Sequence, residues 1–423
     1  MKMKNTFDFD ELIERRGTGC VKWDEPYPSE EAATADAEQG RPLIPLWVAD
    51  MDFAVAPAIQ KAIQRRAQHP AYGYTYVPED YYQAVISWFR RRHQWDIRRE
   101  EILYTTGVVP AMSVAVKALT MPGEKVVFLS PDYNCFFSSV RNNGCEVVES
   151  ALVRKGDGKG VRGASLPRFE IDWADFEEKC ADEKTTVFLL CNPHNPTGRV
   201  WTSEELERLN DICMRHGVRV VSDEIHCELV MPGHRFQPFA AVSEACRQNS
   251  VVLNSPSKSF NIAGLQTANI VCADPEVRRR LNRAININEV CDLNPFGPVA
   301  LIAAYNESED WMDALNDYLW GNYQALCRWF AEKLPQCVVT DLEGTYLVWV
   351  DVSALLGDGA LVSNVRELCD YIMHKTNVWI NPGTMYGPQT GEGFVRINIA
   401  CPRRCLMEAL ERMIQVLPVQ AGQ

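Results

Sequence analysis

Short apolar and β-branched runs alternate with amphipathic stretches along the first two thirds of the chain. The clearest amphipathic stretch, residues 203–217, begins with Ser203, Glu204 and Glu205 and ends at Gly217, and these residue types are typical of helix ends. Near-continuous apolar strands between helices indicate a mostly parallel β-sheet that is covered on both faces. The predicted strands are residues 124–130, 145–150, 185–193, 217–224, 250–258 and 268–274. The pattern therefore predicts an α/β fold.

In the last third of the chain the pattern changes. A long helical stretch comes first, and it is followed by two predicted strands, residues 344–353 and 391–400. This order indicates a second, smaller α+β domain. We expect a large domain of residues 56–295 and a small domain that combines residues 1–55 with residues 296–423.

Polar residues follow three of the predicted strands of the large domain. In a parallel sheet, ligands bind beyond the carboxyl ends of the strands, so these segments are the first place to look for a site. They read NPHNPTG (residues 192–198), SDEIH (222–226) and NSPSKS (254–259). Most lysines are only solvated surface groups, but Lys258 lies at the end of an apolar strand among serines. It is therefore a candidate nucleophilic amine.

Composition and charge narrow the function classes. The 423 residues carry a formal net charge of −13, so the excess of Lys and Arg that binds nucleic acid or an anionic membrane is missing. No run of about 18 uncharged apolar residues occurs, and no apolar segment follows the basic N-terminus. Fifteen cysteines without a C-x-x-C pair fit reduced thiols in a cytoplasmic protein. We expect small-molecule partners, no nucleic acid, no membrane and no metal.

A Schiff base at Lys258 requires an aldehyde, and pyridoxal phosphate is the commonest electron sink used in this way. That cofactor needs a carboxylate on its pyridine nitrogen, and Asp223 is suited to this, although it is equally suited to capping a helix. Asn195 can donate to the phenolic oxygen of the cofactor, or it can belong to a simple turn after a strand. Tyr133 can cover the ring, or it can be an ordinary half-buried tyrosine.

The phosphate of such a cofactor needs an anion site. Gly107 precedes an apolar-periodic helix, so the amides of Gly107, Val108 and Val109 would face an anion with the helix dipole behind them. Ser255 and Ser257 would add hydroxyl groups. A glycine before a helix is weak support when it stands alone, and it gains weight from the other candidate residues.

Together these motifs resemble the fold-type I pyridoxal-phosphate enzymes of the aspartate aminotransferase superfamily. A closer resemblance, from about residue 7 to residue 413, is to the MalY/PatB group of cystathionine β-lyases. The matching segments are residues 15–24, 45–53, 72–75, 222–230, 257–266, 344–351 and 393–403. The resemblance implies a large domain with a seven-stranded type of mostly parallel sheet, and a smaller α+β domain.

The resemblance also implies roles for matching positions. Lys258 would be the Schiff-base lysine, and Arg396 would clamp the α-carboxylate of the substrate, for which a planar guanidinium is suited. Tyr74 would reach the site of a neighbouring subunit and contact cofactor phosphate and substrate, so the enzyme would be a homodimer. The implied catalytic residues are Lys258, Asp223 and Tyr133. The implied cofactor-binding residues are Lys258, Asp223, Asn195, Tyr133, His226, Val108, Val109, Ser255, Ser257 and Tyr74.

Two positions depart from the pattern of the wider superfamily. Gln266 stands where aminotransferases often have an arginine that pairs with the phosphate. His226 stands where many of them have a tyrosine, and the same change is usual in the lyase group.

The expected activity is therefore that of a pyridoxal-phosphate-dependent carbon–sulfur β-lyase. It would cleave cystathionine, cystine or cysteine to pyruvate, ammonia and a thiol, and the sequence leaves the preferred substrate open. One alternative is a class I/II aminotransferase, and another is a lyase scaffold that also binds a transcription regulator.

Overall fold

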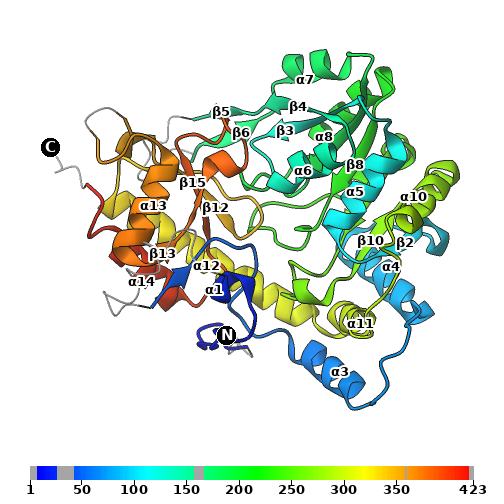
Figure 1. The fold of residues 1–423 in the computed structure, drawn as a ribbon, viewed down its shortest axis with the longest axis horizontal. Coiled ribbons are helices and arrows are strands. Elements are labelled where there is room, and N and C mark those ends of the chain that lie inside the picture. Colours follow the sequence, from blue (N-terminus) through cyan, green and yellow to red (C-terminus); the bar gives the residue numbers. More distant parts are fainter. Residues whose placement is uncertain (1–6, 26–41, 157–165, 358–359, 419–423) are drawn as a thin grey trace.

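The structure is a computed structural model that describes residues 7–25, 42–156, 166–357 and 360–418. Its centre is a seven-stranded sheet with the strand order β2-β10-β9-β8-β7-β3-β4 (Figure 1). The bounds in this order are Ile102–Thr105, Ala268–Val271, Ser250–Asn254, Arg219–Asp223, Thr185–Cys191, Lys125–Ser130 and Glu146–Ala151. Strands β4, β3, β7, β8 and β9 pair in parallel, whereas β10 is antiparallel to both of its neighbours. The predicted α/β class with a mostly parallel sheet is confirmed.

Two apolar cores cover the two faces of this sheet. Side chains alternate across a strand, so Val126 and Phe128 of β3 enter one core, whereas Val127 and Leu129 enter the other. Helices α5, α6 and α10 fill the first core, and α7 and α8 fill the second. Burial on both faces explains why these strands read as continuous apolar runs in the sequence.

The helices occupy the stretches between the strands and most of the last third of the chain. The predicted helix at residues 203–217 is α8, and Thr202 caps it by accepting a hydrogen bond from the Glu205 backbone N–H. The helix bounds are α1 Val21–Asp24, α3 Pro57–Ala67, α4 Glu79–His93, α5 Val108–Leu119, α6 Asn134–Asn142, α7 Trp173–Cys180, α8 Ser203–Arg215, α9 Glu244–Asn249, α10 Pro275–Ile287, α11 Gly297–Glu307, α12 Glu309–Lys333, α13 Val365–Thr376 and α14 Arg403–Met413. None of the helices in the described ranges is long and apolar enough to span a membrane.

A second sheet of four strands lies in the C-terminal third. It has the order β11-β12-β15-β14, and its central strands fall within the two predicted strands of the small domain. The bounds are β11 Val338–Val339, β12 Leu347–Asp351, β15 Phe394–Asn398 and β14 Asn381–Pro382. The N-terminal strand β1 (Ile44–Pro45) pairs in parallel with β13 (Val378–Trp379), so this part of the N-terminal segment packs against the C-terminal third (Figure 1).

The division into residues 56–295 and the two flanking segments stays a prediction. Helix α11, which this division assigns to the small domain, packs on α3 and α4 of the large one. An antiparallel pair, β5 (Val153–Lys155) and β6 (Arg168–Glu170), lies on either side of residues 157–165, which are outside the described residues.

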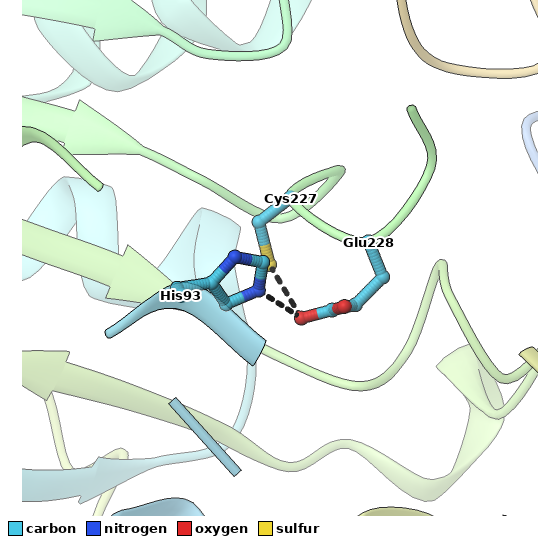
Figure 2. Close-up of side chains that lie close together, drawn as sticks. All are labelled: His93, Cys227 and Glu228. Carbon is cyan, nitrogen blue, oxygen red and sulfur yellow. Dashed lines mark hydrogen bonds and ion pairs between the residues drawn. The ribbon is translucent and has the colours of Figure 1, made fainter. Parts of the chain in front are cut away.

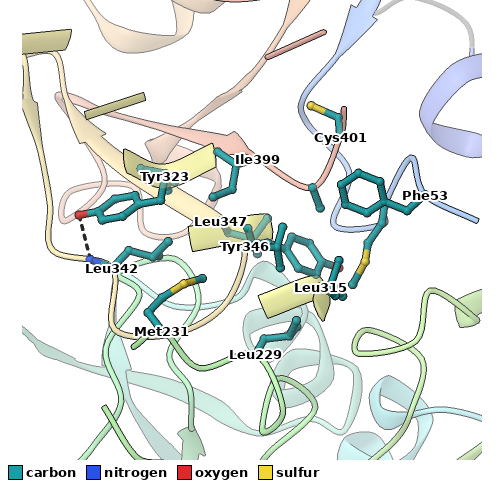
Figure 3. Close-up of a cluster of buried hydrophobic side chains, with 14 of the residues drawn as sticks. Phe53, Leu229, Met231, Leu315, Tyr323, Leu342, Tyr346, Leu347, Ile399 and Cys401 are labelled. Carbon is teal, nitrogen blue, oxygen red and sulfur yellow. Dashed lines mark hydrogen bonds between the residues drawn. The ribbon is translucent and has the colours of Figure 1, made fainter. Parts of the chain in front are cut away.

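One apolar cluster joins the two sheets (Figure 3). Leu229 and Met231, which follow β8, pack in it with Leu347 of β12, Leu315 of α12 and Phe53 of the N-terminal segment. All five side chains are at most 4% exposed. Because burial of such a side chain contributes about 1.5–3 kcal/mol, the cluster fixes the end of β8 relative to the smaller sheet.

Candidate active site

A pocket of about 300 Å³ opens beyond the carboxyl ends of β3, β7, β8 and β9, which are neighbours in the sheet. Each of these strands contributes one predicted residue. Tyr133 follows β3, Asn195 follows β7, Asp223 is the last residue of β8, and Lys258 follows β9. The residues lining the pocket are Ala49, Thr106, Gly107, Val108, Val109, Pro110, Tyr133, Cys191, Asn195, Asp223, Ile225, His226, Ser257, Lys258, Ala263 and Gln266.

The amine of Lys258 lies inside the protein. Its Nζ donates a hydrogen bond to the backbone oxygen of Ala49 at 2.6 Å. Burial lowers the pKa of this amine, although the carboxylates of Asp50 and Asp223 act in the opposite direction. A lowered pKa increases the fraction of neutral amine, which is the form that attacks an aldehyde or accepts a proton.

Asp223 is a buried carboxyl group without a cationic partner. It is 4% exposed, and one of its oxygens accepts a hydrogen bond from the Ile225 backbone N–H at 3.1 Å. No ion pair joins it to any residue that the structure describes. Burial raises its pKa to about 7. A protonated ring nitrogen in the pocket would therefore stabilise the ionised carboxylate.

Arg396 and Asn195 are linked across the pocket wall. Arg396 Nη1 donates to Asn195 Oδ1 at 3.0 Å, and Nη2 donates to the backbone oxygen of Trp47 at 2.7 Å. Arg396 is 3% exposed, and within the described ranges no carboxylate pairs with it. A buried guanidinium that meets only neutral acceptors favours an anionic ligand. Because Oδ1 of Asn195 is occupied, its Nδ2 is the atom left to donate into the pocket.

His226 lines the same pocket and is 3% exposed. Its Nδ1 is buried and has no hydrogen-bond partner within the described part of the chain. The ring meets Tyr346 edge-on, with 5.9 Å between the ring centroids. Burial, together with the charges of Lys258 and Arg396, lowers the pKa of His226 to about 3. The imidazole is therefore neutral near pH 7 and brings hydrogen-bonding capacity rather than charge.

The N-terminus of α5 forms one end of the pocket. Gly107, Val108 and Val109 line the pocket, and the first helical hydrogen bond runs from the Ala111 N–H to the Gly107 oxygen. The amides of Val108 and Val109 therefore precede the regular ladder and are open to an anion. Ser257 lines the pocket beside them.

Two residues at this end differ in their placement. Ser255 was expected to face the phosphate, but its hydroxyl donates to the backbone oxygen of Thr267 at 2.6 Å and lies outside the pocket lining. The same hydroxyl accepts a hydrogen bond from the Ser257 backbone N–H at 3.0 Å, so both of its contacts are internal to the protein. Gln266 lines the pocket. A neutral amide therefore stands where aminotransferases often have an arginine that pairs with the phosphate.

Tyr74 lies away from the pocket of its own chain. It is 102% exposed, and the nearby Tyr72 and Tyr76 are 53% and 79% exposed. A contact between Tyr74 and the site of another subunit stays a prediction.

The N-terminal segment also contributes to the site, and the hydrophobic pattern and the candidate motifs did not predict this contribution. Backbone oxygens of Trp47 and Ala49 hold Arg396 and Lys258, and Asn398 Nδ2 donates to the backbone oxygen of Val48 at 2.6 Å. This segment matched the lyase group in sequence, and that match was the available signal. Backbone acceptors leave no residue-type signature of their own.

A second buried polar cluster lies outside the pocket (Figure 2). Glu228 Oε1 accepts a hydrogen bond from Trp88 Nε1 at 2.7 Å, lies 2.6 Å from His93 Nε2, and accepts a weaker bond from Cys227 Sγ at 3.6 Å. The other oxygen lies 3.5 Å from Arg92 Nε. A histidine, a cysteine and a glutamate are metal-ligand types, but here three donors already engage Oε1, and the guanidinium of Arg92 lies beside Oε2, which has no hydrogen bond of good geometry. The cluster is explained as a buried carboxylate paired with a cation of its own chain.

The fold and the site together define a class. A lysine, a buried carboxyl group and an asparagine beyond adjacent parallel strands, next to a helix N-terminus, are the arrangement of fold-type I pyridoxal-phosphate enzymes. The chain belongs to the aminotransferase class I and II family, whose model matches residues 41–413.

Individual relatives narrow the resemblance. The chain is 39% identical to cystathionine beta-lyase PatB of Bacillus subtilis (strain 168), over 96% of this chain and 98% of that protein. It is 33% identical to protein MalY of Escherichia coli (strain K12), over 97% and 99%. The crystal structure of cystalysin from Treponema denticola, which contains a pyridoxal 5′-phosphate cofactor, superposes with a TM-score of 0.88 at 32% identity, over 97% of this chain and 98% of that one. The resemblance to the MalY/PatB group is confirmed.

The residues of the pocket fit pyridoxal phosphate. Asp223 lacks a cationic partner, Asn195 retains a free amide donor, and the amides that open α5 form an anion site at the other end. Lys258 lies between them. The volume of about 300 Å³ is at the lower end of the range for sites of small molecules.

Proposed function

We propose that the protein is a pyridoxal-phosphate-dependent carbon–sulfur β-lyase. It cleaves cystathionine or related β-thio amino acids, such as cystine and cysteine, by α,β-elimination to pyruvate, ammonia and a thiol. The observation that carries the proposal is a buried amine in the pocket lining, Lys258, near a buried guanidinium, Arg396, which has no carboxylate partner among the described residues and donates to the lining residue Asn195. Support for the reaction class comes from the 39% identity to a protein named cystathionine beta-lyase.

The side chains divide the work as follows. Pyridoxal phosphate, when bound, supplies the electron sink that accepts the electron pair released at Cα of the amino acid. Arg396 binds the α-carboxylate, because a guanidinium fork matches its two oxygens. The neutral amine of Lys258 takes the Cα proton and holds it as an ammonium. The sulfur at Cβ then leaves as a thiolate, and one water molecule from solvent converts the remaining three-carbon amino fragment to pyruvate and ammonia.

The remaining side chains hold the cofactor. Asp223 carries the negative charge opposite the ring nitrogen, and Asn195 Nδ2 donates to the phenolic oxygen. Tyr133 would cover the ring of the bound cofactor, and neutral His226 would contribute hydrogen-bonding capacity without adding a positive charge. The amides of Val108 and Val109, with the hydroxyl of Ser257, bind the phosphate.

A second candidate activity is transamination, because the matching family model is that of class I and II aminotransferases. The two activities are separated by incubating the purified enzyme with cystathionine, cystine, cysteine or an amino-acid/2-oxo-acid pair. The lyase releases pyruvate from a sulfur amino acid without any added 2-oxo acid. A transaminase needs the acceptor, so pyruvate that forms only when a 2-oxo acid is present would overturn the proposal.

The enzyme is proposed to act as a homodimer in which Tyr74 contacts the cofactor phosphate and substrate of the neighbouring subunit. The exposed tyrosines at positions 72, 74 and 76 support this, because aromatic side chains are enriched at interfaces. Mixed dimers of Lys258→Ala and Tyr74→Ala subunits test it. Each mixed dimer has one intact site, so it regains about half of the wild-type activity. Mixed dimers as inactive as either parent would contradict the arrangement.

We place the enzyme in the cytoplasm. All fifteen cysteines are free in the structure, and most of them are buried. Free thiols in this number are typical of a reducing compartment. Cell fractionation with an antibody against the chain checks this placement, and recovery in the secreted fraction would contradict it.

A further inference from the structure

Two buried side chains behind the pocket, Asp132 and His194, have no role in the chemistry described above. Both are 0% exposed. Asp132 lies in the loop after β3, next to Tyr133, and His194 lies in the loop after β7, next to Asn195. Each is therefore the direct chain neighbour of a residue proposed to contact the cofactor.

Polar contacts join the two loops at this point. His194 Nε2 lies 3.5 Å from Asp132 Oδ2 and 3.3 Å from the backbone oxygen of Leu129 in β3. On its other side, His194 Nδ1 lies 2.8 Å from Thr197 Oγ1 within its own loop. The ring of His194 therefore contacts its own loop, the C-terminal end of strand β3 and the carboxyl group of Asp132.

Asp132 in turn holds the loop that carries Tyr133. Its Oδ1 accepts the Tyr133 backbone N–H at 2.6 Å, and its own N–H donates to the backbone oxygen of Tyr386 at 2.7 Å. Its Oδ2 is buried and has no hydrogen bond of good geometry, so the contact with His194 is its only polar neighbour among the described side chains. A buried carboxyl oxygen without a good hydrogen bond lowers the stability of the folded protein. A residue kept at this position despite that loss of stability is a candidate for a functional role.

Resting on the cofactor role proposed above, we propose that Asp132 and His194 are positioning residues that lock the Tyr133 loop to the Asn195 loop. The pair sets the separation between the side chain that covers the cofactor ring and the amide that donates to its phenolic oxygen. Through Asn195 Oδ1, which accepts from Arg396 Nη1, the same pair also bears on the carboxylate-binding guanidinium.

The test measures cofactor binding rather than turnover. His194→Ala and Asp132→Asn are compared with wild type by titrating the apoenzyme with pyridoxal phosphate and by recording the circular dichroism of the bound cofactor. Residues that orient binding groups typically change affinity 10–100-fold. We expect the dissociation constant to rise at least about 10-fold for His194→Ala and a few-fold for Asp132→Asn, with a weaker cofactor dichroism signal.

A matched control separates positioning from general loss of stability. His93→Ala also removes a buried histidine, but one that lies in the Glu228 cluster outside the pocket. It should lower the melting temperature and leave the dissociation constant of the cofactor within about 2-fold. If His194→Ala and Asp132→Asn weaken binding no more than this control does, the proposal is wrong.

A double-mutant cycle with Asn195→Ala completes the test. If His194 acts through Asn195, its removal costs little once the asparagine side chain is gone, so the two effects combine to less than their product. Independent, multiplying effects would overturn the positioning role. The cycle measures only the dissociation constant of the cofactor. Its outcome can therefore be told apart from the outcome of the pyruvate assay, which tests the proposed lyase activity.

Discussion

Two buried carboxyl groups five residues apart behave in opposite ways. Asp223 and Glu228 are both 4% exposed, yet burial raises the pKa of Asp223 to about 7, whereas the pKa of Glu228 is below its ordinary value. Burial alone would raise the pKa of Glu228 as well, but the neighbouring His93, Trp88 and Arg92 outweigh it. The difference is therefore one of partners, not of depth.

The two carboxyl groups belong to two kinds of region, a ligand site around Asp223 and a structural cluster around Glu228. The carboxylate of Glu228 has hydrogen-bond donors on Oε1 and a guanidinium beside Oε2 within the chain, although Oε2 has no hydrogen bond of good geometry (Figure 2). Asp223 and His226 in the pocket lining, and Arg396 beside it, have incomplete partners among the described residues, so these polar groups cost stability until a ligand supplies the missing partners. Unsatisfied capacity, rather than the presence of reactive residue types, marks the functional region.

The largest effect is expected on the pocket side, at Lys258. Replacing Lys258 by Ala removes the amine that accepts the Cα proton, so the rate of pyruvate release should fall at least about 1,000-fold, or about 4 kcal/mol. The melting temperature of the apoenzyme should stay the same or rise, because a buried amine is lost. Steady-state pyruvate assays and thermal unfolding check both halves. Normal pyruvate formation by this variant would refute the assignment of the site.

The matching change on the structural side is His93→Ala. It leaves the buried Glu228 carboxylate with fewer partners, so the free energy of unfolding should fall by about 3 kcal/mol. The kcat/KM per folded molecule should change less than about 3-fold, because the cluster does not line the pocket. Urea unfolding and pyruvate release are the measurements, with His216→Ala on the surface as the control. A large loss of kcat/KM with unchanged stability would reverse the distinction between the two regions.

A smaller effect is expected from Arg396→Lys. The substitution keeps a cation but loses the two-donor fork. The loss of transition-state stabilisation measured by kcat/KM should be about 2 kcal/mol, and it should appear mainly as a higher KM for the sulfur amino acid. Stability should change little, because the guanidinium meets only neutral acceptors in the free protein. A variant with unchanged KM would exclude Arg396 as the carboxylate binder.

Local pattern predicted much of this molecule from the sequence. The parallel sheet and the placement of Lys258 and Asp223 follow from apolar runs that end in polar residues, because strand ends and site residues are then the same short segments. Arg396 entered only through resemblance, since nothing local distinguishes an arginine within a strand.

Contacts distant in sequence account for what the pattern did not predict. Ser255 lies outside the pocket lining, because its hydroxyl donates a hydrogen bond to the backbone oxygen of Thr267, twelve residues later. The backbone oxygens of Trp47 and Ala49 reach Arg396 and Lys258 across more than 200 residues of chain. Such contacts depend on how the N-terminal segment packs on the smaller sheet, and residue types do not encode them directly.

The most direct test exchanges each of the two carboxyl groups for an amide, as Asp223→Asn and Glu228→Gln, in the apoenzyme. For Asp223, a pKa of about 7 in the folded chain against an ordinary 3.8 means that stability is lost as pH rises from about 4 to 7. At pH 8, Asp223→Asn should therefore raise the free energy of unfolding by about 2–4 kcal/mol, and by less at pH 6.

The second half of the same measurement has the opposite expected sign. Glu228→Gln should lower the free energy of unfolding by about 2–4 kcal/mol at pH 8 and at pH 6, because the pKa of Glu228 is low and its ionised form is the paired one. Urea unfolding of the two variants beside wild type decides the matter. Opposite signs support the account of a buried carboxylate with a cationic partner beside one without such a partner among the described residues, and losses of similar size at both positions would contradict it.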